Sequence, residues 1–433
     1  MGVMPVRLAL VLGLLVLGGV ATAAPAAVPK ADHTVINLVN GRDRWQAVHD
    51  EVRPVILALG EARTDEDRKP LEDRLVDELG RKAIEVLVRY REPFLVPVFA
   101  RLTEHEDWAV RRLAVFALQR NLGLQALDRI VVRLADDEAL VREIAATTVA
   151  ILHVAASKHK DLLPRDKAIK AAAKGMRKRK KADLAALQER LAAEKNPFVQ
   201  SALRASIESL GKRKLLLIHT EPVVEEAPGR FVPRLEGGQV NAYQTGSGIS
   251  SSGSGRLKPT TGWGYPVMLY PREVLTLTSD PPLVPLPQKG NSFHYGHDCG
   301  WFLEGSGIYA VADGVVRWIR SGGDWGGLLV TEHQDADGAK VSAVNGHCGM
   351  WMFVKGGEKV VKGQLLAQMG LSFSAENGGH GAHDHFGLYT GGFSEGHCYG
   401  RGRTDRTNEE WLVPADFLTE KVEGERLAPD SYR

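Results

Sequence analysis

Five residues in the C-terminal part of the sequence have the types and the spacing that metal-dependent chemistry requires. His294 and Asp298 lie four positions apart, and His383 and His385 lie two positions apart. On a β-strand an even spacing places side chains on one face, whereas on a helix residues two apart diverge by about 200°. A strand would therefore direct each pair toward one point. His347 stands alone between the two pairs.

Imidazole and carboxylate groups are the usual ligands of catalytic zinc, which takes three protein ligands and keeps a fourth position open for water. His294, Asp298 and one member of the His383 and His385 pair provide such a set. Zinc lowers the pKa of a bound water toward about 7, which makes hydroxide available at neutral pH. The remaining histidines can orient that water and stabilise charge on a tetrahedral intermediate. The pattern indicates metal-assisted hydrolysis.

The chain around these residues predicts β-structure. Ile308–Ile319 and Leu328–Val344 each hold two short apolar runs, joined by an Asp-Gly pair that begins at Asp313 in the first and at Asp337 in the second. Asp-Gly between such runs is a strong hairpin signal. We therefore expect two hairpins within a mainly antiparallel β domain over residues 291–420.

These motifs resemble those of the lysostaphin-type, or LytM-domain, zinc endopeptidases. That family carries H-x-x-x-D, usually as H-x-G-x-D, which begins here at His294. It closes on H-x-H-F, which begins here at His383, and its isolated middle histidine corresponds to His347. The resemblance covers residues 291–389.

The resemblance implies that His294, Asp298 and His385 bind zinc and that His347 and His383 act on the water and the oxyanion. It implies a zinc metalloendopeptidase that hydrolyses peptide bonds, with peptidoglycan cross-links as the substrate. Two alternatives stay open, a non-catalytic regulator of another cell-wall hydrolase and a general secreted protease. Regulators of that kind have typically lost zinc ligands, and no ligand is missing from this sequence.

The sequence departs from the family pattern at two positions, and other histidines lie nearby. Asp384 stands where an apolar residue is usual; at odd spacing it points to the opposite strand face, to orient a ligand histidine or to pair with a base. Asn345 stands where an aromatic residue is usual, which leaves the fit of the substrate open. We expect packing or surface roles for His297 and a structural hydrogen bond for His333. His380, in a glycine-rich loop, either lines the site or has no role.

Residues 45–215 show the periodicity of helices. The apolar spacing that begins at Val110 returns at Val141, 31 positions later, and at Val199, 58 positions further, which is twice 29. This internal repeat resembles short HEAT-like repeats, which stack pairs of helices, and a plain helical domain is the alternative. We expect this domain to fold separately and to supply no catalytic groups.

The sequence therefore predicts a multidomain α+β protein, in which an N-terminal α-helical repeat domain precedes a C-terminal, mainly antiparallel β peptidase domain. Residues 216–290 are rich in Gly, Ser and Pro and read as a linker with irregular structure, and residues 421–433 form a tail. A basic run over Lys158–Lys181 offers a contact for an anionic envelope polymer or a protein partner; a solvated helix face is the alternative. The run has no aromatic residues, which argues against nucleic acid.

The first residues are typical of a secretory signal peptide over residues 1–23. Arg7 precedes an apolar run too short to span a bilayer comfortably, and a small-x-small cleavage pattern ends at Ala23. A leader segment over residues 24–44 follows. We expect a secreted or periplasmic protein with no stable transmembrane anchor.

Three cysteines occur in the 433 residues. Cys299 and Cys348 directly follow Asp298 and His347, so on strands both thiols would point to the face opposite the site. We predict a Cys299–Cys348 disulfide behind the site, with Cys398 as the free thiol.

Overall fold

The computed structural model describes residues 38–159, 167–212, 215–218, 303–321, 325–394 and 410–422, together with shorter stretches between residues 224 and 300. Residues 42–433 belong to one compact unit. The expected signal peptide, the first two thirds of the leader segment and most of the tail lie outside the described residues, as does Cys398.

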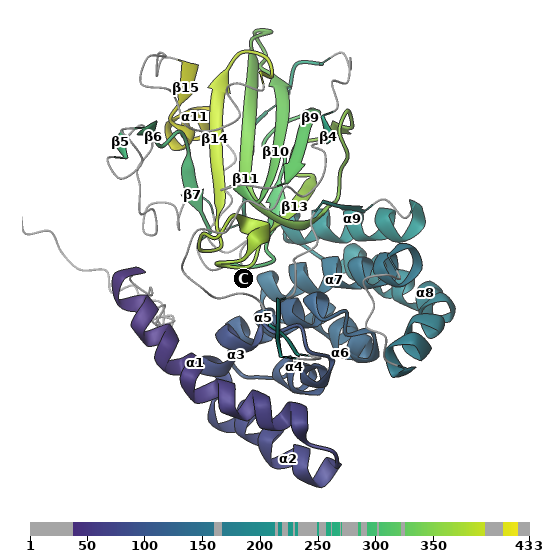
Figure 1. Cartoon of the computed structure of the whole chain (residues 1–433). Coiled ribbons are helices and arrows are strands. Elements are labelled where there is room, and N and C mark those ends of the chain that lie inside the picture. The colour runs from purple at the N-terminus through teal and green to yellow at the C-terminus, as the bar shows by residue number, and fades with distance from the viewer. Residues whose placement is uncertain are drawn as a thin grey trace, which may run out of the picture. The chain divides into compact units, whose positions relative to one another are not determined.

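The N-terminal part of the described chain is helical (Figure 1). Polar residues cap the starts of α5 and α9: the Asp107 carboxylate accepts a hydrogen bond from the Ala109 amide (2.9 Å), and the Asn196 side-chain oxygen accepts one from the Phe198 amide (3.0 Å). The helices are α1 (Leu38–Glu61), α2 (Asp65–Asp73), α3 (Gly80–Leu87), α4 (Val96–Leu102), α5 (Trp108–Arg120), α6 (Leu127–Val132), α7 (Ala139–Lys158), α8 (Lys167–Ala193) and α9 (Pro197–Lys212).

The three valines that set the internal repeat, Val110, Val141 and Val199, lie near the starts of α5, α7 and α9, and each is fully buried. Helix α7 packs against α5, α8 and α9. The predicted helical half is therefore confirmed, and its assignment to the HEAT-like class stays a prediction.

Helix α7 is the one described helix whose length and hydropathy would allow it to cross a membrane. All of its apolar stretch is buried inside the protein. Core helices of globular proteins share this composition, because a helix covered on every side is apolar all round. Helix α7 is accordingly the central helix of the fold.

The C-terminal part forms an eleven-stranded sheet with the main order β12-β9-β10-β11-β13-β8, and β14 pairs with β11, β7 and β15. The pairings among the described strands are antiparallel, which confirms the predicted fold class. The strands are β1 (Leu216–Leu217), β2 (Val224–Ala227), β3 (Arg230–Val232), β4 (Ile249–Ser250), β5 (Pro285–Leu286), β6 (Ser292–Phe293), β7 (His297–Cys299), β8 (Gly307–Tyr309), β9 (Gly314–Ser321), β10 (Gly327–Gln334), β11 (Lys340–Met352), β12 (Lys359–Val360), β13 (Leu365–Met369), β14 (Asp384–Thr390) and β15 (Trp411–Leu412), and helix α11 (Pro414–Val422) follows them.

One of the two predicted hairpins forms. Asp337 and Gly338 lie in the turn between β10 and β11, where Gly338 has φ +85°, a conformation that glycine adopts at little cost. The hairpin predicted at Asp313 is wrong, because β8 pairs with β13 while β9 pairs with β10. Gly314 instead begins β9, where an added Cβ would come within 2.4 Å of the Glu332 carbonyl oxygen. This glycine allows two strands to approach closely.

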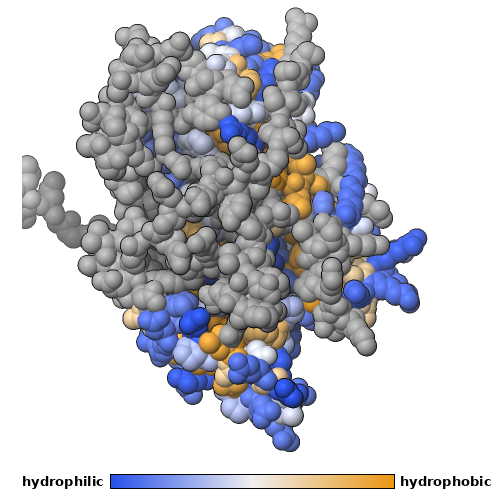
Figure 2. Space-filling model, viewed as in Figure 1, coloured by the Kyte–Doolittle hydropathy of each residue, from blue (hydrophilic) through white to orange (hydrophobic). Residues whose placement is uncertain are grey.

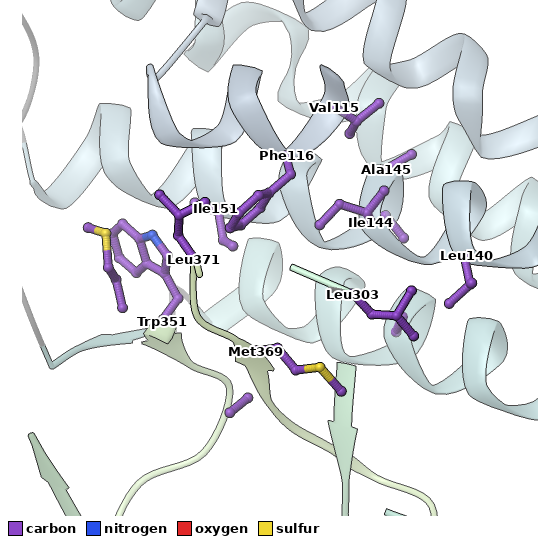
Figure 3. Packing of buried hydrophobic residues seen from close by; sticks show 14 of the residues in the cluster. Val115, Phe116, Leu140, Ile144, Ala145, Ile151, Leu303, Trp351, Met369 and Leu371 are labelled. Carbon is purple, nitrogen blue, oxygen red and sulfur yellow. The ribbon is translucent and has the colours of Figure 1, made fainter. Parts of the chain in front are cut away.

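The helices and the sheet share one apolar core (Figure 3). In that view Phe116 and Ile144, from α5 and α7, lie close to Leu303 and Met369 of the β part. The approach is tight at Gly305, where an added Cβ would lie 2.5 Å from the Phe116 ring and 2.8 Å from Ile144. The structure thus differs from the expectation of a separately folding helical domain, since the two halves bury their side chains against each other.

Buried polar groups also join the two halves. The Gln368 amide nitrogen, on β13, donates to Thr147 Oγ1 and to the Gly305 carbonyl, both at 2.9 Å. Gln119, on α5, donates to Gln368 Oε1 at 3.0 Å. Buried polar groups are costly when unpaired, so these bonds specify how helices and sheet fit together.

Burial of Glu143 in this shared core makes the stability of the protein depend on pH. Glu143 lies on α7, accepts a hydrogen bond from the Tyr309 hydroxyl of β8, and burial raises its pKa from 4.5 to about 7. The folded state therefore holds a proton that the unfolded state loses between these pH values, so the contribution of Glu143 to stability is lost as pH rises from about 4.5 to about 7.

We predict that Glu143→Gln removes this dependence. From pH 5 to pH 8, the free energy of unfolding of the wild type should fall by about 2.5 kcal/mol relative to the variant. Urea unfolding of both proteins at the two pH values measures this difference. An equal difference at pH 5 and pH 8 would contradict the role of Glu143.

Candidate metal and catalytic site

Strand β14 assembles the site because it pairs with β7 on one side and with β11 on the other. The register places His385 opposite Asp298 of β7 and opposite Gly346 of β11, the residue before His347. His294 lies just ahead of β7 and His383 just ahead of β14. The topology thus brings residues that are far apart in the chain to one place.

Three ligand atoms converge in the arrangement that zinc requires. His294 Nε2 lies 2.9 Å from His385 Nδ1, and each of these nitrogens lies 3.2 Å from Asp298 Oδ1. Tetrahedral bonds of about 2.0–2.1 Å would separate ligand atoms by about 3.3 Å. The three side chains are buried, and their spacing and chemistry fit a zinc ion.

The electrostatics suit a cation as well. Burial alone would raise the pKa of Asp298, but the nearby His383 and hydrogen bonds from the surrounding imidazoles hold that pKa well below its usual range. Burial lowers the pKa of His385 to about 4. The carboxylate is therefore ionised and His385 is neutral near pH 7, which are the forms that bind metal.

His383 contacts this set from the side. Its Nε2 lies 3.3 Å from Asp298 Oδ1, and its Nδ1 lies 2.7 Å from the Gly381 carbonyl oxygen, to which it donates. It does not belong to the group of ligand atoms that lie close to one another in the described residues. His383 is thus oriented by the backbone and adjoins the carboxylate without completing the ligand set.

His347 completes the cluster, so the structure brings all five predicted site residues together. Its ring centre lies 4.3 Å from that of His383 and 6.3 Å from that of His385. His347 Nδ1 lies 2.7 Å from the carbonyl oxygen of Asn377, so Nδ1 carries the proton and Nε2 keeps a free lone pair. Burial first, and then the proximity of His383, lowers the pKa of His347 well below its usual range. A neutral imidazole with one free nitrogen can accept a proton.

The backbone of His347 is strained. Its φ is +60°, a conformation that costs a non-glycine residue on the order of 1–3 kcal/mol and is found most often at functional sites. A hydrogen bond from the Gly370 amide to the His347 carbonyl, 2.9 Å long, fixes the turn. The surrounding segments therefore hold this side chain in a defined direction.

Two further aromatic residues border the site. The Trp325 ring stacks at 27° on His347 with centres 5.7 Å apart, and its edge meets the His385 ring at 4.9 Å. No motif in the sequence predicted that Trp325 lies at the site. The glycine at position 346 is the one related feature, because an added Cβ there would lie 2.5 Å from the Trp325 indole. The ring centre of His380 lies 4.7 Å from that of His347. Of the two alternatives for His380, the structure therefore favours a residue that lines the site.

The face behind the site does not have the expected contacts. Asp384 is fully buried, and in the described part of the chain neither of its carboxylate oxygens has a hydrogen-bond partner, so it orients no histidine and pairs with no base there. Burial and the nearby charge of Asp298 raise its pKa well above the usual range. Its surroundings therefore favour the neutral form of Asp384.

The predicted Cys299–Cys348 disulfide is wrong, because both residues are buried free thiols. Cys299 lies on β7 and Cys348 on β11, and β14 runs between these strands. Strands are spaced about 4.8 Å apart, so the two Cα atoms are separated by about 9–10 Å, beyond the usual limit of about 7 Å. Both thiols lie near Asp384, but they are not on neighbouring strands.

His333 and His297 lie outside the ligand group. His333 is completely buried, with its ring nitrogens 2.8 Å from Thr331 Oγ1 and 3.1 Å from the Asp313 carbonyl oxygen. This confirms the expected structural hydrogen bond. His297 is buried on β7 and lies outside the ligand group.

One family model matches the segment that holds the site. Residues 292–395 match the model of Peptidase family M23, and all five site residues lie in that segment. A solved crystal structure of a peptidase M23 from Pseudomonas aeruginosa is similar with 22% identity and a TM-score of 0.20, covering 31% of this chain and 49% of that one. This chain thus spans about half the length of that protein. No curated protein matches the sequence.

We predict that the chain binds one zinc ion through His294, Asp298 and His385. Asp298→Ala should lose the metal, because it removes the one anionic ligand. Substitution of a residue that only hydrogen-bonds to a ligand lowers metal affinity by about 10–100-fold, and the loss in Asp298→Ala should be larger. His383→Ala should retain the metal. Metal content per chain, measured by mass spectrometry after dialysis against zinc, tests both. Zinc loss in His383→Ala with retention in His385→Ala would reverse the two assignments.

Proposed function

We propose that this protein is a secreted zinc metalloendopeptidase that hydrolyses the peptide bonds of peptidoglycan cross-links. The observation that carries the proposal is the set of three ligand atoms within 3.2 Å of one another. The match of residues 292–395 to a peptidase family supports it. The substrate and the location follow from the resemblance of the motifs and from the pattern of residues 1–23.

His347 and His383 have different roles in the proposed hydrolysis. When bound, zinc would acidify a water molecule and polarise the scissile carbonyl group. His347, neutral and with Nδ1 bonded to Asn377, offers Nε2 as the acceptor of a proton. His383, held by Gly381 and adjacent to Asp298, is assigned the hydrogen bond to the developing oxyanion.

The two alternatives make different demands on the site. A non-catalytic regulator needs no complete ligand set, whereas His294, Asp298 and His385 are all present and converge. A general protease would use the same site, so only the substrate separates it from a wall hydrolase. We place the cell-wall enzyme first because the whole set of motifs resembles that class.

We predict that the wild-type protein releases cross-linked peptides from purified peptidoglycan and that His347→Ala lowers kcat by about 100-fold or more while keeping its zinc. Chromatography and mass spectrometry of the digest would reveal new amino termini at the cross-links. Cleavage of an unfolded protein with no action on peptidoglycan would favour the general protease. No cleavage of either by the zinc-loaded protein would favour the regulator.

The helical half supports a second part of the proposal, contact with an anionic polymer of the cell envelope. Lys170, Lys174, Arg177, Lys178 and Lys181 are exposed on α8 and follow spacings of three and four, which place them along one side of the helix. No ion pair of these residues occurs within the described part of the chain. Figure 2 shows hydrophilic residues projecting on the side where α8 lies in Figure 1.

We predict that replacing Lys170, Lys174, Lys178 and Lys181 by Gln weakens binding to isolated cell wall and makes it less sensitive to salt, because exposed charges are screened within about 10 Å at 0.1 M ionic strength. The kcat on a soluble peptide should stay unchanged. Sedimentation with wall fragments at several salt concentrations measures binding. A matched control replaces four exposed lysines elsewhere, Lys82, Lys195, Lys355 and Lys359. Equal weakening by both sets would indicate general charge attraction only.

A further inference from the structure

The segment that joins β13 to His383, residues 370–382, contacts both histidines that do not bind the metal. It contains a short 3₁₀ turn, Ala375–Asn377, and the Asn377 carbonyl accepts the Nδ1 proton of His347 at 2.7 Å. The Gly381 carbonyl accepts the corresponding proton of His383 at 2.7 Å. The conformation of this segment therefore sets the direction of both imidazoles.

Glu376, the neighbour of Asn377, fixes the segment from inside the protein. Its Oε1 accepts the Leu371 amide at 2.8 Å, within the segment, and its Oε2 accepts the Met350 amide at 3.2 Å, three residues after His347. Arg120, the last residue of α5, donates to the same carboxylate. One side chain thus ties the segment to β11 and to the helical half.

The energetics make Arg120 necessary to this arrangement. The side chains of Arg120 and Glu376 are each only 2% exposed. An unpaired buried carboxylate is strongly unfavourable, so removal of one partner of a buried pair is strongly destabilising. Arg120 therefore supplies the positive partner of a buried carboxylate that accepts three hydrogen bonds.

His347 depends on such support because its own backbone opposes the observed conformation. With φ at +60° the turn persists only if its surroundings hold it. Displacement of Glu376 would move Asn377 and remove the acceptor of the Nδ1 proton. The proton could then occupy Nε2, and His347 would no longer present a free lone pair there.

Other arginines of the helical half reach the same segment. Arg89 donates to the Ser372 carbonyl, and Arg112 forms an ion pair at 3.5 Å with Glu304. Glu304 accepts the Ser372 hydroxyl at 2.6 Å, and Ser372 Oγ accepts the Ala382 amide at 2.8 Å, next to His383. The helical half thus contacts the segment at Ser372 and at Glu376, and Ser372 passes this support to Ala382.

We infer that Arg120, acting through Glu376, is a positioning residue that fixes the tautomer and direction of His347, so the helical half is part of the catalytic apparatus although it supplies no group that touches substrate. This inference rests on the proposed peptidase function for its kinetic consequence. Its structural consequence, the position of one proton on His347, stands apart from that function.

The test uses the full chain with Glu376→Gln or Arg120→Lys, which keep the shape of one partner and the charge of the other. On a soluble cross-linked peptide, kcat should fall by about 10–100-fold, with KM and zinc content within about twofold of wild type. Nitrogen NMR of ¹⁵N-histidine protein should show His347 protonated at Nδ1 in the wild type and a mixture of tautomers in the variants.

The matched control is Arg142→Lys, which perturbs a buried ion pair with Glu194 inside the helical half, 2.8 Å long, with side chains 6% and 2% exposed. It should lower the midpoint of thermal unfolding as the test variants do, with kcat and the His347 tautomer unchanged.

Two results would overturn the inference: wild-type kcat and an unchanged tautomer in folded Glu376→Gln and Arg120→Lys, or an equal loss of kcat in Arg142→Lys. A wild-type protein that binds zinc and cleaves nothing would refute the proposed function instead, and the tautomer comparison would then decide the inference alone.

Discussion

The site depends on one constraint, that a carboxylate must stay ionised where there is almost no water. Asp298 is buried, and burial opposes its charge. The protein meets this demand with three imidazoles within 3.3 Å of the same oxygen atom, two of which lie close enough to share a metal ion with it. The antiparallel order of β7, β14 and β11 brings these groups together from distant parts of the chain.

Burial also separates the two faces of β14 chemically. His385 and Asp384 are adjacent in sequence and point to opposite sides. On the metal side, polar neighbours keep Asp298 charged; on the other side, where the two thiols lie, burial favours the neutral form of Asp384. The same apolar surroundings thus stabilise a charge on one face and suppress one on the other, according to the partners that each face provides.

The residues that converge at the site could be predicted from sequence, whereas the order of the strands could not. The even spacing of His294 and Asp298, and of His383 and His385, identified both pairs, although only Asp298 and His385 lie within strands, β7 and β14. The disulfide failed because neighbouring positions in two motifs say nothing of a third strand between them. The contact of Arg120 with Glu376 joins residues 256 positions apart, and no periodicity reports such a distance. The composition of the linker was misleading as well. Its Gly- and Ser-rich stretch predicted a helical domain that folds separately, but the buried side chains that join the two halves lie outside that stretch.

The tight approach at Gly305 bears on how such a protein can change over evolutionary time. The segment that resembles other peptidases, residues 292–395, has an inner surface that fits Phe116 and Ile144 and leaves no room for even a methyl group. A segment of this kind is not freely exchanged between proteins, since a new neighbour would have to reproduce that surface and its buried hydrogen bonds. The two halves of this chain are therefore bound to diverge together, each substitution on one side limiting what the other can accept.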